Sequence, residues 1–171
     1  MDQQISLESV ITFLVATPLF RHLDAAERGQ VARIMEVQRL KEGEQVFREG
    51  EEGDAWYVVF DGKAKVLKNL STGPEEIAVL DSGACFGEMA ILDGMPRSAS
   101  VIAAGPLTVF RFRRERFDEL LGNESLGAYK LVAAMARTLS QRQRLLTQQV
   151  TSLLGRSEPT RVAVEQFQIS E

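Results

Sequence analysis

Nine of the thirteen glycines fall between residues 43 and 105, where they separate short runs rich in valine, phenylalanine and isoleucine. Glycine adopts the backbone angles of tight turns at little cost, so each of these glycines indicates a turn between strands. The predicted strands, all within residues 37–112, are QVF, AWYVVF, KAKVLK, EIAVL, SASVIA and LTVFRF. Because no long helical pattern separates them, they predict an antiparallel sandwich or barrel, and they disfavour a parallel α/β sheet.

Helical spacing precedes these strands, from residue 1 to about residue 36. The apolar side chains expected to face the core from the first helix are Ile5, Val10, Phe13 and Leu14. Asp24 lies three positions before Glu27, ahead of the run VARIM, and this spacing predicts a capping box at the start of a second helix. The first part of the chain is therefore expected to be helical.

Helical spacing returns after residue 112, with RRERFDELL and then an unbroken segment over residues 123–155. In a heptad frame, position a holds Tyr129, Ala136, Gln143 and Val150, and position d holds Val132, Leu139, Leu146 and Leu153. Gln143 is the polar exception, and one polar a residue can fix register and oligomeric state. The seam predicts a homodimer through Leu139, Leu146, Val150 and Leu153. The alternative is a long amphipathic helix on its own β domain, which the first two turns are expected to form.

Overall charge and cysteine content exclude several classes of protein. The formal net charge of -4 argues against coating of nucleic acid or anionic lipid by bulk electrostatics. Cys85 is the single cysteine, so a disulfide scaffold is excluded and a cytoplasmic location is expected. The apolar run VITFLVATPLF follows Asp2 and Glu8 and is too short to span a bilayer, so neither a signal peptide nor a membrane segment is predicted.

Catalytic motifs are missing from the sequence. A cupin-type metal site needs several histidines, and the chain has only His22, which is interpreted as an ordinary helix or turn residue. Neither G-x-S-x-G, nor a Walker lysine motif, nor a pair of cysteines is present. We therefore expect a protein that is not an enzyme, with no catalytic residues and no metal ligands.

The segment FGEMAILDGMPRSASV, residues 86–101, combines two charges with small and apolar residues. Gly87 allows a tight turn that exposes N–H groups at the start of a short helix, and such a terminus binds anions. Arg97 can hold two oxygens of a phosphate, with the Ser98 hydroxyl beside it. Glu88 can accept a hydrogen bond from a sugar hydroxyl. The segment is consistent with a pocket for an anion that carries a sugar, or with a plain salt bridge between Glu88 and Arg97.

The same segment resembles the phosphate-binding cassette of the cyclic nucleotide-binding domain family, whose pattern is F-G-E-[LM]-A-L, a short spacer and P-R-[STA]-A-[ST]-V. Similarity extends to TPLFRHLDAAE, to KEGEQVFREGEEGDAWYVVFDGKAKV and to RRERFDELL, and covers residues 16 to about 145. The resemblance implies a mainly β fold, an eight-stranded antiparallel β-roll (jelly roll), with N-terminal helices and a long C-terminal helix.

The resemblance also implies roles for residues of the cassette. Glu88 would bind the ribose 2′-hydroxyl, and Arg97 with Ser98 would hold the cyclic phosphate. The remaining ligand-binding positions of the cassette are the backbone amides near Gly87, Glu88 and Ala99 and the adjoining Met89 and Ala90. The implied ligand is cAMP, with cGMP next, and no catalytic cofactor is expected.

The long helix is expected to supply the contact with the base. MARTLSQRQ resembles the helix in which a transcription activator of the family sets a threonine and a serine against adenine, and Arg142 and Gln143 stand at those positions here. Arg142 either contacts the base or is a solvated helix residue, and the sequence leaves both interpretations open.

Three regions are predicted: a binding domain over residues 1–122, a lid and dimerisation helix over residues 123–155, and a polar tail over residues 156–171. The tail is too short for a three-helix DNA reader, so DNA binding is not expected. The basic cluster Arg111, Arg113, Arg114 and Arg116 is interpreted as a solvated face. We expect a stand-alone sensor that signals through its C-terminal helix to an unknown effector protein. The alternatives are a degenerate family member acting as a dimeric interaction module, or a cGMP receptor.

Overall fold

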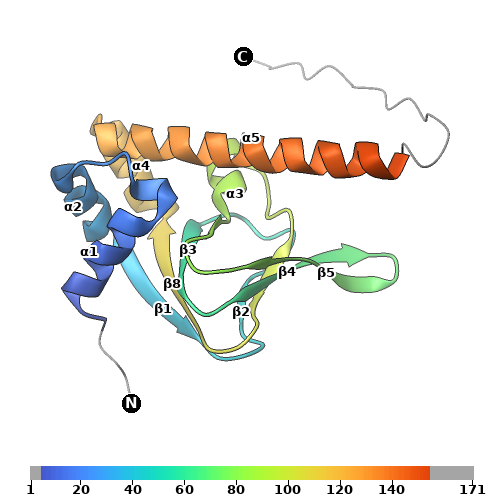
Figure 1. Ribbon diagram of the computed structural model, residues 1–171. Helices are drawn as coiled ribbons and strands as arrows, with labels where there is room; N and C mark the ends of the chain where they lie inside the picture. Colours follow the sequence, from blue (N-terminus) through green and yellow to red (C-terminus); the bar gives the residue numbers. More distant parts are fainter. Residues whose placement is uncertain (1–4, 155–171) are drawn as a thin grey trace. The chain divides into compact units, whose positions relative to one another are not determined.

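The computed structural model describes residues 5–154 (Figure 1). The helical elements are α1 (Leu7–Ala16), the 3-10 turn η1 (Pro18–Phe20), α2 (Ala25–Arg33), α3 (Glu88–Asp93), α4 (Arg114–Gly122) and α5 (Leu126–Leu154). The strands are β1 (Met35–Leu40), β2 (Gln45–Phe47), β3 (Ala55–Asp61), β4 (Ala64–Leu70), β5 (Gly73–Leu80), β6 (Cys85–Phe86), β7 (Ser100–Ala103) and β8 (Leu107–Arg113).

The eight strands of the described residues form two four-stranded sheets. Their orders are β1-β8-β3-β6 and β2-β7-β4-β5. Every pairing is antiparallel. This arrangement is a β-roll with flanking helices and a long C-terminal helix, and it confirms the fold class predicted from the sequence.

Strands β3 and β8 separate two hydrophobic clusters, which explains why they are apolar on both faces. Trp56 and Phe112 stack with ring centroids 3.9 Å apart in the cluster that faces the helices. Tyr57 and Val109 belong to the cluster between the two sheets. Successive side chains of a strand point to opposite faces, so a strand covered on both sides needs a continuous apolar run.

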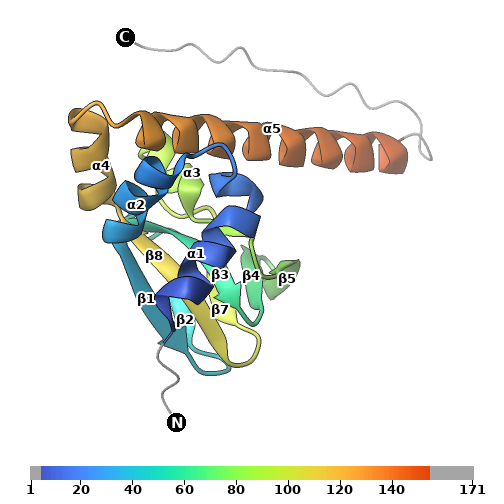
Figure 2. The ribbon, with the colours of Figure 1, turned by 60° about the vertical axis from the view of Figure 1, so that its left-hand side comes forward.

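The N-terminal helices pack on the outer face of the sheet that contains β1 and β8 (Figure 2). The Asp24 carboxylate accepts a hydrogen bond from Glu27 N, and the Glu27 carboxylate accepts one from Asp24 N. This confirms the predicted capping box. Val10 and Leu14 are buried, and Ile5 and Phe13 pack against the same cluster, as expected from their spacing.

The limits of the first strands differ from the sequence prediction. Helical spacing was expected to continue to about residue 36, but α2 ends at Arg33 and β1 begins at Met35. The segment MEVQRL has a single buried residue, Leu40, so its alternation is weak. The two-residue strand β6 is also absent from the predicted strands, because two residues define no periodicity.

Contacts between residues divide the chain into two units, residues 1–135 and residues 136–171. In the first unit, the start of α5 buries Ala128, Leu131 and Met135 in the cluster under α1 and α2. In the second unit, three predicted seam residues of α5 are exposed: Leu146 at 55%, Val150 at 49% and Leu153 at 68%. The predicted tail, residues 156–171, lies outside the described residues.

Candidate functional site

The turn between β6 and α3 begins the cassette and depends on one glycine. Gly87 has a φ of 74°, in the left-handed region, and α3 starts at the next residue. A Cβ atom on Gly87 would lie 2.9 Å from Arg97 Nη1 and 3.2 Å from Phe47 Cε1. Glu88, the first residue of α3, is only 2% exposed. The predicted tight turn and short helix are both present, and they place a carboxylate in the protein interior.

Arg97 brings the far end of the cassette back to this turn. Its Nη1 donates a hydrogen bond of 2.8 Å to the carbonyl oxygen of Gly87, and its Nη2 donates one of 2.7 Å to the carbonyl oxygen of Ala55. The same Nη2 lies 3.3 Å from Asp54 Oδ1. Only 1% of the Arg97 side chain is exposed. A guanidinium is therefore buried next to the residue that opens α3.

Aromatic rings line the guanidinium of Arg97. Its Cζ lies 4.1 Å from the centroid of the Phe47 ring and 5.9 Å from that of Tyr57. Cation–π attraction of this kind favours a charged guanidinium over the ring face. Burial lowers the pKa of Arg97, while Tyr57 and the Asp54 carboxylate act in the opposite direction. Since arginine remains protonated in proteins, the site keeps a buried positive charge.

Backbone and side-chain bonds fix the segment around Arg97. Arg97 N donates to the carbonyl oxygen of Glu51 at 2.8 Å, and Gly50 N donates to that of Arg97 at 2.9 Å. Lys68 Nζ donates to the carbonyl oxygen of Ser98 at 2.7 Å. These bonds tie the cassette to the turn before β3 and to β4, so its backbone has little freedom.

The structure brings together the cassette positions that the sequence singled out. Glu88, Ala90, Arg97 and Ala99 are buried in the same unit. Met89 is 45% exposed, and Ser98 Oγ lies 3.9 Å from its sulfur atom. Arg142 and Gln143 belong to the second unit, so their contact with a base remains a prediction.

Two residues at the site were missed by sequence reasoning. Asp54 precedes β3 and accepts hydrogen bonds from both Arg97 and Arg111. Arg111 was assigned to a solvated basic face, and that assignment is wrong: its side chain is only 24% exposed and Tyr57 is its neighbour across the sheet. It is wrong for Arg114 as well, which donates to the carbonyl oxygens of Gly53 and Ala90.

The other two arginines of the cluster fit the interpretation as a solvated face, since the side chains of Arg113 and Arg116 are 51% and 59% exposed. Strand alternation gives a signal for Arg111, which has the same parity as the apolar residues Leu107 and Val109 of β8. It does not separate Arg111 from Arg113, which has the same parity at the end of β8, and it does not apply to Arg114 and Arg116, which belong to α4.

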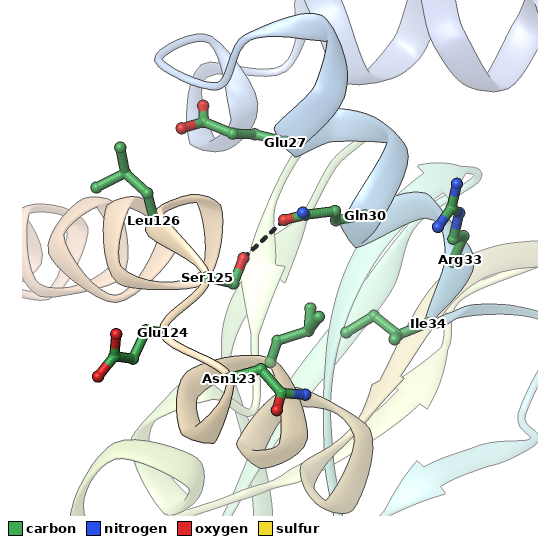
Figure 3. A pocket seen from close by; sticks show the side chains of 9 residues that line it. Glu27, Gln30, Arg33, Ile34, Asn123, Glu124, Ser125 and Leu126 are labelled. Carbon is green, nitrogen blue, oxygen red and sulfur yellow. Dashed lines mark hydrogen bonds between the residues drawn. The ribbon is translucent and has the colours of Figure 1, made fainter.

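Two cavities lie away from the cassette. One of about 530 Å³ lies between α2 and the turn that joins α4 to α5, where Ser125 Oγ lies 2.8 Å from Gln30 Oε1 (Figure 3). The other, of about 460 Å³, is an apolar groove between α1 and α2 that includes Ile11 and Ala32. Neither contains Glu88 or Arg97.

Within residues 5–154, no cluster of three or more histidine, cysteine or acidic side chains is arranged to hold a metal ion. None of the helices in this range combines the length and apolar character of a membrane span.

Comparison with known proteins identifies the family. A sequence model described as the cyclic nucleotide-binding domain matches residues 37–124. The chain belongs to this family, as its resemblance in the cassette predicted.

Relatives and solved structures agree with this assignment. The chain is 37% identical over 115 residues to a cAMP-dependent protein kinase regulatory subunit of Mycosarcoma maydis, with 64% of this chain and 22% of the relative covered. It is 33% identical over 110 residues to the regulatory subunit of Mucor circinelloides f. lusitanicus, with 64% of this chain and 26% of that protein covered. The chain thus spans about a quarter of the length of these relatives.

Two bacterial structures resemble the chain over a larger share of its length. A cyclic nucleotide-binding domain from Methylobacillus flagellatus superposes with a TM-score of 0.75 at 26% identity, and covers 91% of this chain and 86% of that one. The catabolite activator protein of Thermus thermophilus superposes with a TM-score of 0.66 at 30% identity, and covers 78% and 63%.

Proposed function

We propose that this chain is a cyclic nucleotide receptor, with cAMP as its ligand and cGMP as the next candidate. The observation that carries the proposal is the buried guanidinium of Arg97, which is bonded to the carbonyl of Gly87 beside the buried carboxyl group of Glu88. A cation and an acid that are both withdrawn from water in one small cassette suit a ligand with an anionic group and a hydroxyl. The relatives named as cAMP-dependent kinase regulatory subunits support cAMP in particular.

The unused donors of Arg97 support an anionic ligand. A guanidinium has five N–H groups, and three are used by Gly87, Ala55 and Asp54. The Nε–H group is buried and has no hydrogen-bond partner among the described residues. An unsatisfied buried donor costs about 1–3 kcal/mol, so a phosphate oxygen that accepts from it gains that stabilisation. We assign the cyclic phosphate to Arg97 and Ser98.

The sugar is assigned to the other end of the cassette. Glu88 would accept a hydrogen bond from the ribose 2′-hydroxyl, which is a neutral donor. The carboxylate is not assigned to the phosphate, because the two negative charges would repel each other. Backbone N–H groups near Gly87, Glu88 and Ala99 would complete the phosphate cradle, with Met89 and Ala90 adjoining. Arg142 and Gln143 are the proposed contacts to the base.

The proposed biological role is that of a non-catalytic, cytoplasmic sensor that acts on a protein partner through its C-terminal helix. A ligand changes the population of helix arrangements only if it binds one arrangement more tightly than the other. The lid and dimerisation helix, residues 123–155, is the proposed output, and the homodimer would form through Leu139, Leu146, Val150 and Leu153. The protein partners implied by the names of the kinase regulatory relatives support this role.

Calorimetric titration of the purified chain with cAMP, cGMP and cyclic dinucleotides tests the proposed ligand. We expect saturable binding of cAMP, weaker binding of cGMP and no binding of cyclic dinucleotides. Failure of every cyclic mononucleotide to bind would refute the receptor function. Sedimentation with and without cAMP then shows whether the ligand changes the oligomeric state.

A degenerate, dimeric interaction module is the second candidate. One observation favours it: both Nη atoms of Arg97 already bond to backbone carbonyls, so these two nitrogens have partners within the protein itself. This candidate predicts that the chain dimerises and binds no nucleotide, whereas the receptor predicts binding by the same sample.

A further inference from the structure

A row of four directly opposed residues crosses the sheet β1-β8-β3-β6 and ends at the cassette. Arg111 of β8 pairs with Glu36 of β1 on one side and with Tyr57 of β3 on the other, and Tyr57 pairs with Phe86 of β6. Directly opposed residues of an antiparallel sheet project to the same face. Tyr57 and Phe86 belong to the cluster between the two sheets, so the Arg111 side chain lies on that inner face.

The contacts of Arg111 include two acidic side chains, one of which also contacts the cassette residue Arg97. Arg111 Nη2 donates a hydrogen bond to Asp54 Oδ2, and its Nη1 lies 3.7 Å from Glu36 Oε2. Its Nε is buried without a hydrogen-bond partner among the described residues. Burial lowers the pKa of Arg111, but Tyr57 and Asp54 together outweigh burial and raise it. Arg111 is therefore a cation held in place at the end of the roll.

Asp54 joins Arg111 to Arg97, because each oxygen of its carboxylate faces one of the two arginines. Oδ1 lies 3.3 Å from Arg97 Nη2, and Oδ2 accepts the bond from Arg111. The Asp54 side chain is 62% exposed, whereas that of Arg97 is 1% exposed. An exposed carboxylate next to a single long bond would sample several rotamers, so a second bond is needed to fix it.

We propose that Arg111 is a positioning residue of the nucleotide site, which fixes Asp54 and through it the orientation of the Arg97 guanidinium. The inference rests on the proposed function and assigns to it a residue outside the cassette. A phosphate is held by a guanidinium only when the N–H groups point at its oxygens, so a freely rotating Asp54 would weaken the phosphate contact without removing it.

Arg113 provides a matched control. It lies two residues further along the same strand and on the same face, and its Nε donates to Glu36 Oε1 at 2.8 Å. Like Arg111 it pairs with Glu36, but the structure gives it no contact with Asp54. Removing Arg113 therefore removes a cation and a link to β1 while leaving the path to Arg97 intact.

Calorimetric titration with cAMP tests whether Arg111 acts on Arg97 through Asp54. We expect Arg111→Ala and Asp54→Ala to weaken binding about tenfold each, and Arg113→Ala to change it by less than about twofold. The double variant of Arg111 and Asp54 should bind no more weakly than the weaker single variant, because both remove the same link. The proposal would be overturned if the losses of cAMP affinity in the two single variants added in the double variant, or if Arg113→Ala lost as much affinity as Arg111→Ala. If Arg111→Ala does not fold, Asp54→Asn provides the same test, because it removes the carboxylate charge between the two arginines at an exposed side chain. It is then expected to weaken cAMP binding as Asp54→Ala does.

The two phosphorothioate diastereomers of cAMP provide a readout that general destabilisation would not change. Each replaces a different exocyclic phosphate oxygen with sulfur, so the ratio of their dissociation constants reports how Arg97 is oriented. We expect this ratio to move toward one in Arg111→Ala and to return toward the wild-type value in Arg111→Lys. An unchanged ratio overturns the positioning role while the receptor function stands. If the wild-type chain binds none of these nucleotides, the receptor function fails with it.

Discussion

Arg97 Nη1 bonds to the carbonyl oxygen of Gly87 at 2.8 Å, and the same nitrogen lies 2.9 Å from the point where a Gly87 Cβ would stand. The two ends of the cassette therefore meet at a residue without a side chain. The backbone of Gly87 is also left-handed, with a φ of 74°. Both features require glycine, one through backbone conformation and the other through space.

Gly87→Ala should consequently destabilise the fold and weaken nucleotide binding. The left-handed conformation alone costs an L-residue about 1–2 kcal/mol, and displacement of Arg97 adds to this. Gly94→Ala is the control, because Gly94 has a φ of 70° but nothing lies within 4 Å of the point that its added Cβ would occupy. We expect chemical denaturation to show a lower free energy of unfolding in both variants, and calorimetry to show weaker cAMP binding in Gly87→Ala alone. Equal cAMP affinity in the two variants would contradict this.

Glu27 has a double role near the start of α5, so its removal should be costly. Its carboxylate caps α2 and accepts bonds of 2.6 and 2.8 Å from Lys130 Nζ, and the residue is 7% exposed. Glu27→Ala leaves Lys130 unpaired and is expected to lower the free energy of unfolding by about 2–4 kcal/mol. In comparison, Glu119→Ala breaks the exposed pair with Arg116 and should cost less than about 1 kcal/mol. If urea denaturation gave equal losses of unfolding free energy for Glu27→Ala and Glu119→Ala, the double role of Glu27 would be contradicted.

Most of the fold could be predicted because it follows periodic patterns. The apolar runs of β3 and β8 and the Asp24 capping box are local signals, and each was found. Strand β1 was not found, because it follows α2 after one residue and carries the polar residues of an edge strand. The tertiary structure therefore determines the boundary near Ile34, where the sequence pattern is ambiguous.

The candidate site could be predicted only in part. The cassette residues are contiguous, so a single motif includes both Glu88 and Arg97. Asp54 and Arg111 are 57 positions apart in sequence and meet through the pairing of β3 with β8. A single sequence contains no signal for such a pairing, and Arg111 was therefore grouped with its neighbours in the chain.

Glu49 should make stability depend on pH in the acid range. Hydrogen bonds from Lys68 and from the backbone of Asn69 lower the pKa of Glu49 below its ordinary value of 4.5. A lowered folded-state pKa gives stability that is present above the unfolded-state pKa and is lost as pH falls through the folded-state pKa. We expect Glu49→Gln to reduce the loss of unfolding free energy between neutral pH and acid. Urea titrations at both pH values measure this, and an unaltered pH dependence would argue against it.

The exposed residues of α5 should support a homodimer. Leu146 and Leu153 stand at successive d positions and are 55% and 68% exposed. Replacement of both by glutamate places charges in the proposed seam and should shift sedimentation velocity toward the monomer. Gln148→Glu, outside positions a and d, is the control and should leave the dimer unchanged. A wild-type chain that sediments as a monomer with and without cAMP would rule out this seam.

The most direct test of the receptor is the affinity of Arg97 variants for cAMP. Arg97→Ala removes about two charge-assisted hydrogen bonds of roughly 1.5–3 kcal/mol each, so binding should weaken at least about 100-fold. Arg97→Lys keeps the charge but loses the planar fork, and its affinity for cAMP should fall between those of the wild-type chain and Arg97→Ala. Circular dichroism establishes that the variants are folded, and Arg113→Ala serves as the control with an affinity near that of wild type.

Calorimetric titration of these proteins with cAMP therefore decides the central claim. The account predicts saturable binding to the wild-type chain, and dissociation constants that rise from wild type through Arg97→Lys to Arg97→Ala. An Arg97→Ala protein that is folded and binds cAMP with the wild-type dissociation constant would contradict it.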